Sequence, residues 1–135
     1  MHADEKRIAK VFESPEAPRV SKANLHVYRL YLLQHFDRKT ILTGREDFPW
    51  EERYIFGSGD PAEYAMRKLT DPSYTDKYEL LDISADVEEH DLIAKVKRLS
   101  DGKQFEIGLS WLTTKPKKGK DYQLLDDFAT WVVNW

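Results

Sequence analysis

Apolar residues recur at helical spacing in the segment SKANLHVYRLYLLQHF, residues 21–36. Intervals of three and four positions separate Leu25, Tyr28, Leu32 and Phe36. This spacing predicts a largely buried helix, with Ser21 or Asn24 able to cap its start. Because Val27, Tyr28 and Tyr31 also suit a strand, the pattern over residues 24–36 leaves both helix and strand open.

A second apolar stripe lies in DYQLLDDFATWVVNW, residues 121–135. Its members, again three and four positions apart, are Leu125, Phe128, Val132 and Trp135. The stripe predicts a C-terminal helix that packs on a sheet, and Asp121 can cap its start. Asp126 and Asp127 fall on the other side of this helix.

Prolines mark two short helices in the middle of the chain. In REDFPWEERYIFGSGD, residues 45–60, Asp47 and Pro49 stand in N-cap and first-turn order, which predicts a short helical turn. Asp60 and Pro61 repeat that signal at the start of PAEYAMRKL. The second helix should end before the Asp-Pro pair at residues 71–72.

Alternating apolar and polar residues predict strands further along. Residues 78–83, YELLDI, form one candidate strand. A hairpin is predicted at residues 92–111, because Asp101 and Gly102 suit a two-residue type I′ turn. With that turn, Lys97 faces Glu106 on the outer face. On the core face the pairs would be Val96 with Ile107, Ala94 with Leu109, and Leu92 with Trp111, with Arg98 opposite Phe105 near the loop.

Together these elements predict an α+β fold with N-terminal helices, a small antiparallel β-sheet and a C-terminal helix. Whether the sheet curls into a small barrel is left open by the pattern. A length of 135 residues suits a single domain, residues 1–135. Pro15 and Pro18 stand among charged residues, so residues 1–22 are expected to be peripheral or poorly ordered.

Composition narrows the class of protein. The 24 acidic and 21 basic residues give a net charge of −3, which is too balanced to predict nucleic-acid binding from bulk charge. Cysteine is absent, which excludes disulfides and thiolate chemistry. No segment approaches the roughly 20 apolar residues of a membrane span, and the N-terminal residues lack the apolar core of a signal peptide. We therefore expect a cytoplasmic protein with no membrane association.

Signals for catalysis are weak. The four histidines, at positions 2, 26, 35 and 90, show no metal-ligand spacing, and no nucleophile motif of the GxSxG type occurs. Gly57-Ser58-Gly59 precedes a helix start but lacks the Lys-Ser/Thr pair of a phosphate-binding loop. A non-enzymatic protein is the expectation.

Carboxylates gather in DISADVEEHD, residues 82–91. Calcium takes six to eight oxygen ligands and favours clustered carboxylates on a loop, although the spacing here is not that of an EF-hand. From local chemistry alone a solvated loop is favoured over a calcium site. Other carboxylates that a fold could add stand at Glu46, Asp47, Glu51, Glu52, Asp126 and Asp127.

A basic set accompanies the hairpin and the following loop, TTKPKKGK. Its members are Lys95, Lys97, Arg98, Lys115, Lys117, Lys118 and Lys120. A surface for nucleic acid would combine such lysines with exposed aromatic rings. Since Phe105 and Trp111 are predicted to face the core, and Glu106 interrupts the set, a solvated face is favoured.

The order of four phrases resembles the small calcium-binding proteins described from cyanobacteria and carried in other bacteria. The phrases are REDFPWEERYIFG, PSYTDKYELL, AKVKRLSDGKQFEIGLSWL and DYQLLDDFATWVVNW, and the resemblance covers about residues 44–135. It implies a cytosolic Ca²⁺-binding protein, with a helical part, a small barrel-like sheet and a C-terminal helix, and with no enzyme activity.

Three functions follow as hypotheses. The first is calcium binding by surface carboxylates, with Ca²⁺ as the bound ion. Its candidate ligands are Asp86, Glu88, Glu89, Asp91, Glu51, Glu52, Asp126 and Asp127. The alternative is a charged protein–protein interaction module without bound metal. A third and weaker hypothesis is a nucleic-acid-binding barrel that uses Lys95, Lys97, Lys117 and Lys118.

Overall fold

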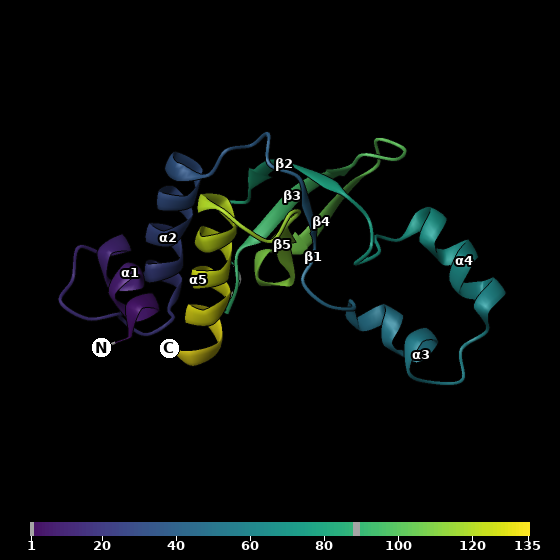
Figure 1. The fold of residues 1–135 in the computed structure, drawn as a ribbon, viewed down its shortest axis with the longest axis horizontal. Coiled ribbons are helices and arrows are strands. Elements are labelled where there is room, and N and C mark those ends of the chain that lie inside the picture. Colours follow the sequence, from purple (N-terminus) through teal and green to yellow (C-terminus); the bar gives the residue numbers. More distant parts are fainter. Residues whose placement is uncertain (1, 88–89) are drawn as a thin grey trace.

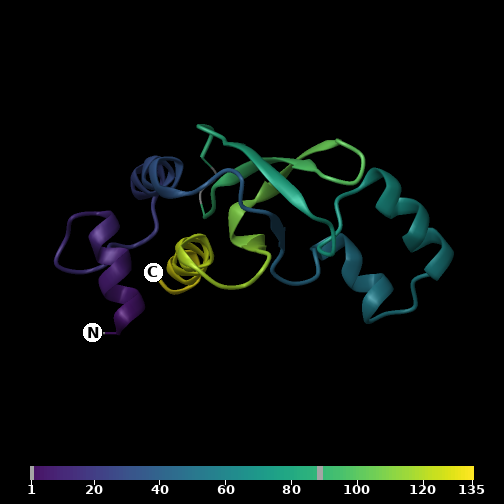
Figure 2. The ribbon, with the colours of Figure 1, turned by 45° about the horizontal axis from the view of Figure 1, so that its top comes forward.

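The computed structural model describes residues 2–87 and 90–135, which form an α+β fold as expected. In these residues α1, α2 and α5 gather at one end of an antiparallel sheet, and α3 and α4 project from the other end (Figures 1 and 2). The helices are α1 (Ala3–Val11), α2 (Lys22–His35), α3 (Glu52–Ile55), α4 (Pro61–Thr70) and α5 (Lys120–Asn134). The strands are β1 (Leu42–Gly44), β2 (Tyr78–Ile83), β3 (Ile93–Arg98), β4 (Gln104–Gly108) and β5 (Leu112–Thr114). Two 3₁₀ turns are η1 (Pro49–Glu51) and η2 (Leu109–Trp111).

The sheet is open. Its strand order is β4-β3-β2-β1-β5, with β4 and β5 at the two edges, so it does not close into the barrel that the sequence left open. The predicted strand at residues 78–83 is confirmed as β2. Strands β1 and β5 were not predicted, because three residues are too few to show an alternating pattern.

The register predicted for the hairpin is wrong by two residues. Ala94 pairs with Ile107 and Val96 with Phe105, and the loop contains four residues, 99–102, rather than two. The Arg98 N–H donates to the Lys103 carbonyl at 2.7 Å and closes this loop. A shift of two preserves the parity of each strand, so the predicted core face is nevertheless buried.

Three further details of the strands differ from prediction. Lys97 faces Gln104 instead of Glu106, and its ammonium group lies 3.4 Å from Glu79 on β2. The hairpin ends at Gly108, because η2 follows it directly. Strict alternation with Tyr78 and Leu80 would turn Asp82 into the core, but a register shift in β2 between Leu80 and Asp82 buries Ile83 instead.

The long element at residues 22–35 is a helix, which decides the alternative that the sequence left open. Ser21 is its cap, since the Ser21 hydroxyl accepts a hydrogen bond from the Asn24 N–H at 3.2 Å. The stripe predicted for this element is buried. On α5 Trp131, which flanks the predicted stripe, is fully buried, and its indole N–H donates to the Pro18 carbonyl at 2.7 Å.

Residues 1–22 were expected to be peripheral or poorly ordered, but they contain α1. Its Ile8 is fully buried in the core, and Phe12 packs against Trp131. The prediction failed because a nine-residue helix with one large core residue shows too little periodicity to detect. The cap predicted for α5 is also wrong, because Gly119 occupies that position and Asp121 lies in the first turn.

Within residues 2–87 and 90–135, none of the helices has both the length and the apolar character that crossing a membrane requires.

Candidate functional site

The carboxylates predicted to bind calcium lie on three separate parts of the fold. Glu51 and Glu52 belong to η1 and α3, whereas Asp126 and Asp127 lie on α5 at the opposite end of the sheet (Figure 1). Among the residues that the structure describes, no group of three or more His, Asp or Glu side chains is placed to hold a metal ion. Glu88 and Glu89 lie outside the described residues.

Asp91, Asp126 and Asp127 have structural partners in the fold. The Asp91 carboxylate accepts hydrogen bonds from the N–H and the hydroxyl of Ser110, the latter at 2.7 Å, and so fixes η2 against β3. Asp126 pairs with Arg45 at 3.0 Å. Each of these bonds stabilises the contact between two elements.

Asp127 was placed on the solvent side of α5 by the sequence, but it is buried. Arg7 on α1 donates to both of its carboxylate oxygens, at 2.7 and 3.0 Å. Gln123 donates to the same carboxylate at 2.9 Å. The prediction was wrong because α1, which covers this face of α5, was not foreseen.

Glu51 is the most completely buried of the predicted ligands that the structure describes, with no exposed surface. One carboxylate oxygen accepts from the Tyr64 hydroxyl at 2.9 Å and the Ser73 hydroxyl at 2.5 Å. The other accepts from the N–H groups of Phe48 and Tyr74, at 3.1 and 3.0 Å. Four donors satisfy this buried charge, so Glu51 joins three chain segments instead of offering ligands to an ion.

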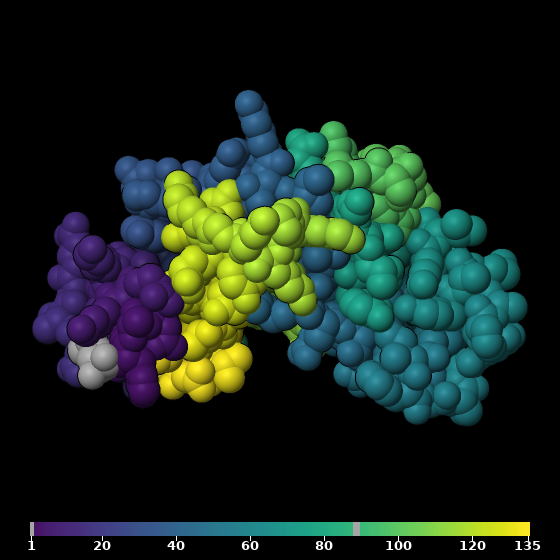
Figure 3. Space-filling model, in the orientation of Figure 1, coloured from purple at the N-terminus to yellow at the C-terminus, as the bar shows by residue number. Residues whose placement is uncertain are grey.

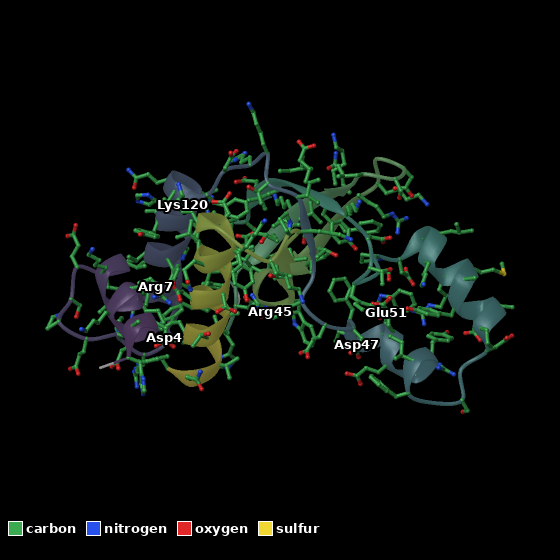
Figure 4. All side chains as sticks on the ribbon, viewed as in Figure 1. Asp4, Arg7, Arg45, Asp47, Glu51 and Lys120 are labelled. Atoms are coloured by element: carbon green, nitrogen blue, oxygen red, sulfur yellow. The ribbon has the colours of Figure 1, made fainter. Side chains whose placement is uncertain are left out.

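Residues 49–72 form a unit that we call the α3–α4 lobe (Figure 4). The helix start predicted at Asp60 and Pro61 is confirmed, since the Asp60 carboxylate accepts from the Ala62 N–H at 3.0 Å. The short turn at Pro49 is also confirmed. Its N-cap is Phe48 rather than Asp47, because the side chain of Glu51 already receives the Phe48 N–H.

Aromatic and cationic side chains attach α4 to the rest of the lobe. The Tyr64 ring stacks on Tyr54 at a centroid distance of 5.0 Å. The Arg67 guanidinium lies 4.6 Å from the Trp50 ring centroid, and the Lys68 ammonium lies 4.2 Å from that of Tyr64. The positions of Tyr64, Arg67 and Lys68 share one face of α4, and this face points inward.

Arg98 ties the hairpin to the end of α4. Its guanidinium is almost fully buried and donates to the carbonyls of Lys68 and Leu69, both at 2.9 Å. Asp76 and Asp101 neutralise it, at 3.0 and 2.7 Å. Since the last carbonyls of a helix lack partners within it, Arg98 caps α4 from a distant strand.

These contacts also shift proton affinities. Burial, together with the hydrogen bond to Glu51, raises the pKa of Tyr64 to about 12. The hydrogen bonds from Arg98 are the main cause that lowers the pKa of Asp101 to about 2. Burial is the larger cause for Tyr64, and the guanidinium of Arg98 is the larger cause for Asp101.

The outward face of α4 is apolar. It carries four residues at positions i, i+3, i+4 and i+7, which we call the outer stripe: Ala62, Ala65, Met66 and Leu69. Met66 is 70% exposed and Leu69 is 66% exposed. No residue of α4 is buried, so the helix presents to solvent the face that amphipathic helices ordinarily turn to the core.

Sequence reasoning found α4 but missed this surface. Met66 and Leu69 share one face of the helix, but Tyr64, Arg67 and Lys68 form a second stripe on it, so the sequence shows no single apolar face. Recognising that two aromatic partners, Trp50 and Tyr54, precede the helix could have suggested which stripe packs inward. The outer stripe is therefore the candidate binding surface.

The geometry defines a small α+β protein with an open antiparallel sheet and a projecting helical lobe. Comparisons of the chain with protein-family models, with curated proteins and with solved structures find no match.

Proposed function

We propose that this protein is a non-enzymatic interaction module that docks a partner protein on the outer stripe of α4. The observation that carries the proposal is the reversed orientation of α4, with its polar face packed and its apolar face in water. Exposed apolar side chains that are contiguous along one helix face cost free energy unless a partner covers them.

The lobe is built to hold that face in place. The buried Glu51 carboxylate accepts from Tyr64 on α4, and the buried Arg98 guanidinium donates to the carbonyls at the end of α4. The Trp50 indole N–H donates to the Pro72 carbonyl at 2.7 Å. A surface that is fixed before binding loses less conformational entropy when a partner docks. The polar attachment of α4 thus prepares its apolar face for binding.

The partner that fits is a protein with an apolar groove that accepts a helix. A helix of ten residues is about 15 Å long and about 10 Å across, so flat contact of one face buries far less than the roughly 800 Å² per partner of a stable interface. A groove that also covers the flanks of the helix gains area. Anchors at i, i+3, i+4 and i+7 are the pattern by which such grooves bind helices.

Charges at the two ends of α4 define the orientation in the groove. Asp60 and Glu63 lie at its start, whereas Lys103 from the hairpin lies beside its end. The Lys103 ammonium donates to the Leu69 carbonyl at 2.6 Å, which places it beside the outer stripe. The groove should therefore be basic where it meets the start of α4 and acidic where it meets the end.

Site-specific photo-crosslinking tests the proposal. A photoreactive side chain at position 66 should form one reproducible adduct in cells, whereas the same group at Leu30, which is 62% exposed on α2, should not. The purified adduct partner must then bind the unmodified protein. Absence of an adduct specific to position 66, or an adduct with a second copy of the chain, contradicts docking to a grooved partner.

A further inference from the structure

A pocket of about 550 Å³ lies away from the α3–α4 lobe, where the connection between α2 and β1 meets the connection between β5 and α5. The Lys115 N–H donates to the Ile41 carbonyl at 2.9 Å and holds the two connections together. In Figure 3 the first connection is the blue segment at the top, and the second is the yellow-green segment directly below it. We call it the lysine pocket, because its lining includes Lys39, Lys115, Lys118 and Lys120.

The four ammonium groups have no hydrogen bond or ion pair to any side chain or carbonyl in the described part of the chain. Lys120, which Figure 4 labels, lies at the start of α5. Three of the four come from the basic set of the sequence analysis, and Lys39 joins them from a segment 76 positions before Lys115. The fold thus converts part of a basic run into a concave site.

The carboxylates in the lining are already engaged. Asp37 accepts from the Lys39 N–H at 2.9 Å. Asp121 accepts from the Asp37 N–H at 3.3 Å and from the Thr40 hydroxyl. These bonds fix the backbone that carries the lysines, and they leave the four cations in excess over the two carboxylates by a charge of +2. In a protein of net charge −3, such a local excess favours an anion.

We propose that the lysine pocket binds a small anion with two linked phosphate groups. Its volume is within the usual range for small-molecule sites, about 300–1,000 Å³. Lysine binds phosphate as a point charge, without the paired geometry of arginine, so several lysines suit a charge spread over more than one group. Ile41 and Pro116 add an apolar wall that can contact an organic part of the ligand.

Calorimetry at low ionic strength tests this site, with pyrophosphate and adenosine diphosphate as probes and sulfate for comparison. Both phosphate probes should bind with one-to-one stoichiometry, and a tenfold rise in salt should weaken binding at least tenfold. Equal affinity of the two probes indicates recognition of phosphate alone, whereas tighter binding of the nucleotide indicates contact with the apolar wall. No heat up to millimolar probe, or equal affinity for sulfate, overturns the proposal.

Matched variants localise the site. Lys39→Gln with Lys118→Gln should weaken pyrophosphate binding at least tenfold, whereas Lys22→Gln with Lys95→Gln, at exposed lysines elsewhere, should leave it unchanged. Amide shifts of the wild-type protein should change over residues 37–41 and 114–121, which requires no variant. Shifts elsewhere, or equal losses in both variant pairs, contradict the assignment. Neither result bears on the outer stripe of α4.

Discussion

Glu51 and Glu52 are neighbours in sequence with opposite environments. Both are glutamates that the sequence offered as calcium ligands. Glu51 is buried and accepts four hydrogen bonds, whereas Glu52 is exposed on α3. Sequence alone does not separate them, because the donors to Glu51 come from residues 48, 64, 73 and 74, which only the tertiary fold brings together.

Glu51→Gln should destabilise the protein by about 2–3 kcal/mol, because hydrogen bonds to a neutral amide oxygen are weaker than those to a carboxylate, and the amide nitrogen would face the Tyr64 and Ser73 hydroxyls, which donate to Glu51. Glu52→Gln is the matched control and should change stability by less than about 0.5 kcal/mol. Urea unfolding measures both. Equal effects of the two substitutions would contradict the structural role of Glu51.

Asp101 should titrate with a pKa of about 2, well below the ordinary aspartate value of about 3.9. A carboxylate whose pKa is lower in the folded state stabilises that state above pH 4, and this contribution is lost as the pH falls from about 4 to 2. Carbon-detected NMR of the carboxyl group measures the pKa directly. In Arg98→Met the pKa of Asp101 should return toward 4. A pKa near 4 in the wild-type protein would contradict the hydrogen bonds between Arg98 and Asp101.

At the scale of elements, the α3–α4 lobe depends on polar bonds more than on apolar burial, since neither α3 nor α4 has a buried residue. Arg98 on β3 supplies the cap for α4 from about 30 positions further along the chain. The stability of the lobe should therefore respond to a substitution in a strand that does not belong to it.

Arg98→Met should destabilise the protein by about 3 kcal/mol, because it leaves the Asp76 carboxylate without its buried cation and removes the guanidinium that donates to the Lys68 carbonyl at the end of α4. Hydrogen exchange should accelerate most in α4. Lys97→Met, one position earlier and half-buried, loses only a surface pair with Glu79 and should cost about 0.5 kcal/mol. Unchanged exchange in α4 would show that the cap is not what stabilises it.

Elements with strong local signals were predictable, and those that depend on distant partners were not. Ser21 with its apolar stripe, and Asp60 with Pro61, specify α2 and the start of α4 locally. The hairpin was found, but its register was misjudged because Asp101 bonds to Arg98 and to the Lys103 N–H instead of forming a two-residue turn. The burial of Asp127 was not predictable, because it depends on a contact with Arg7 on α1, 120 positions earlier in the chain.

At the scale of the whole molecule, calcium binding stays a prediction. The described carboxylates of the predicted set are dispersed, and Glu88 and Glu89 lie outside the described residues. A ligand that binds only the folded state must raise the melting temperature. A melting temperature that is higher in Ca²⁺ than in EDTA or in Mg²⁺ supports a calcium site. If Asp86→Asn removes this difference, the site lies in residues 82–91. Identical melts contradict it.

The distribution of exposed apolar residues over the molecule allows a controlled test of docking. Met66 and Leu69 lie on the outer stripe, whereas Leu30 and Val133 are also exposed, at 62% and 79%, at the other end on α2 and α5. A change from an apolar to an acidic side chain at either place leaves the core untouched. Only the substitutions at Met66 and Leu69 should weaken the binding of a partner to the α3–α4 lobe.

The dissociation constant of the purified complex with the crosslinked partner tests this account most directly. Met66→Glu with Leu69→Glu should weaken binding by at least a hundredfold, since each places a charge where an apolar groove must cover it. Leu30→Glu with Val133→Glu should leave the constant within about twofold, and both variants should keep the wild-type circular dichroism spectrum. Equal weakening by both pairs, or unchanged binding in the first, would contradict docking through α4.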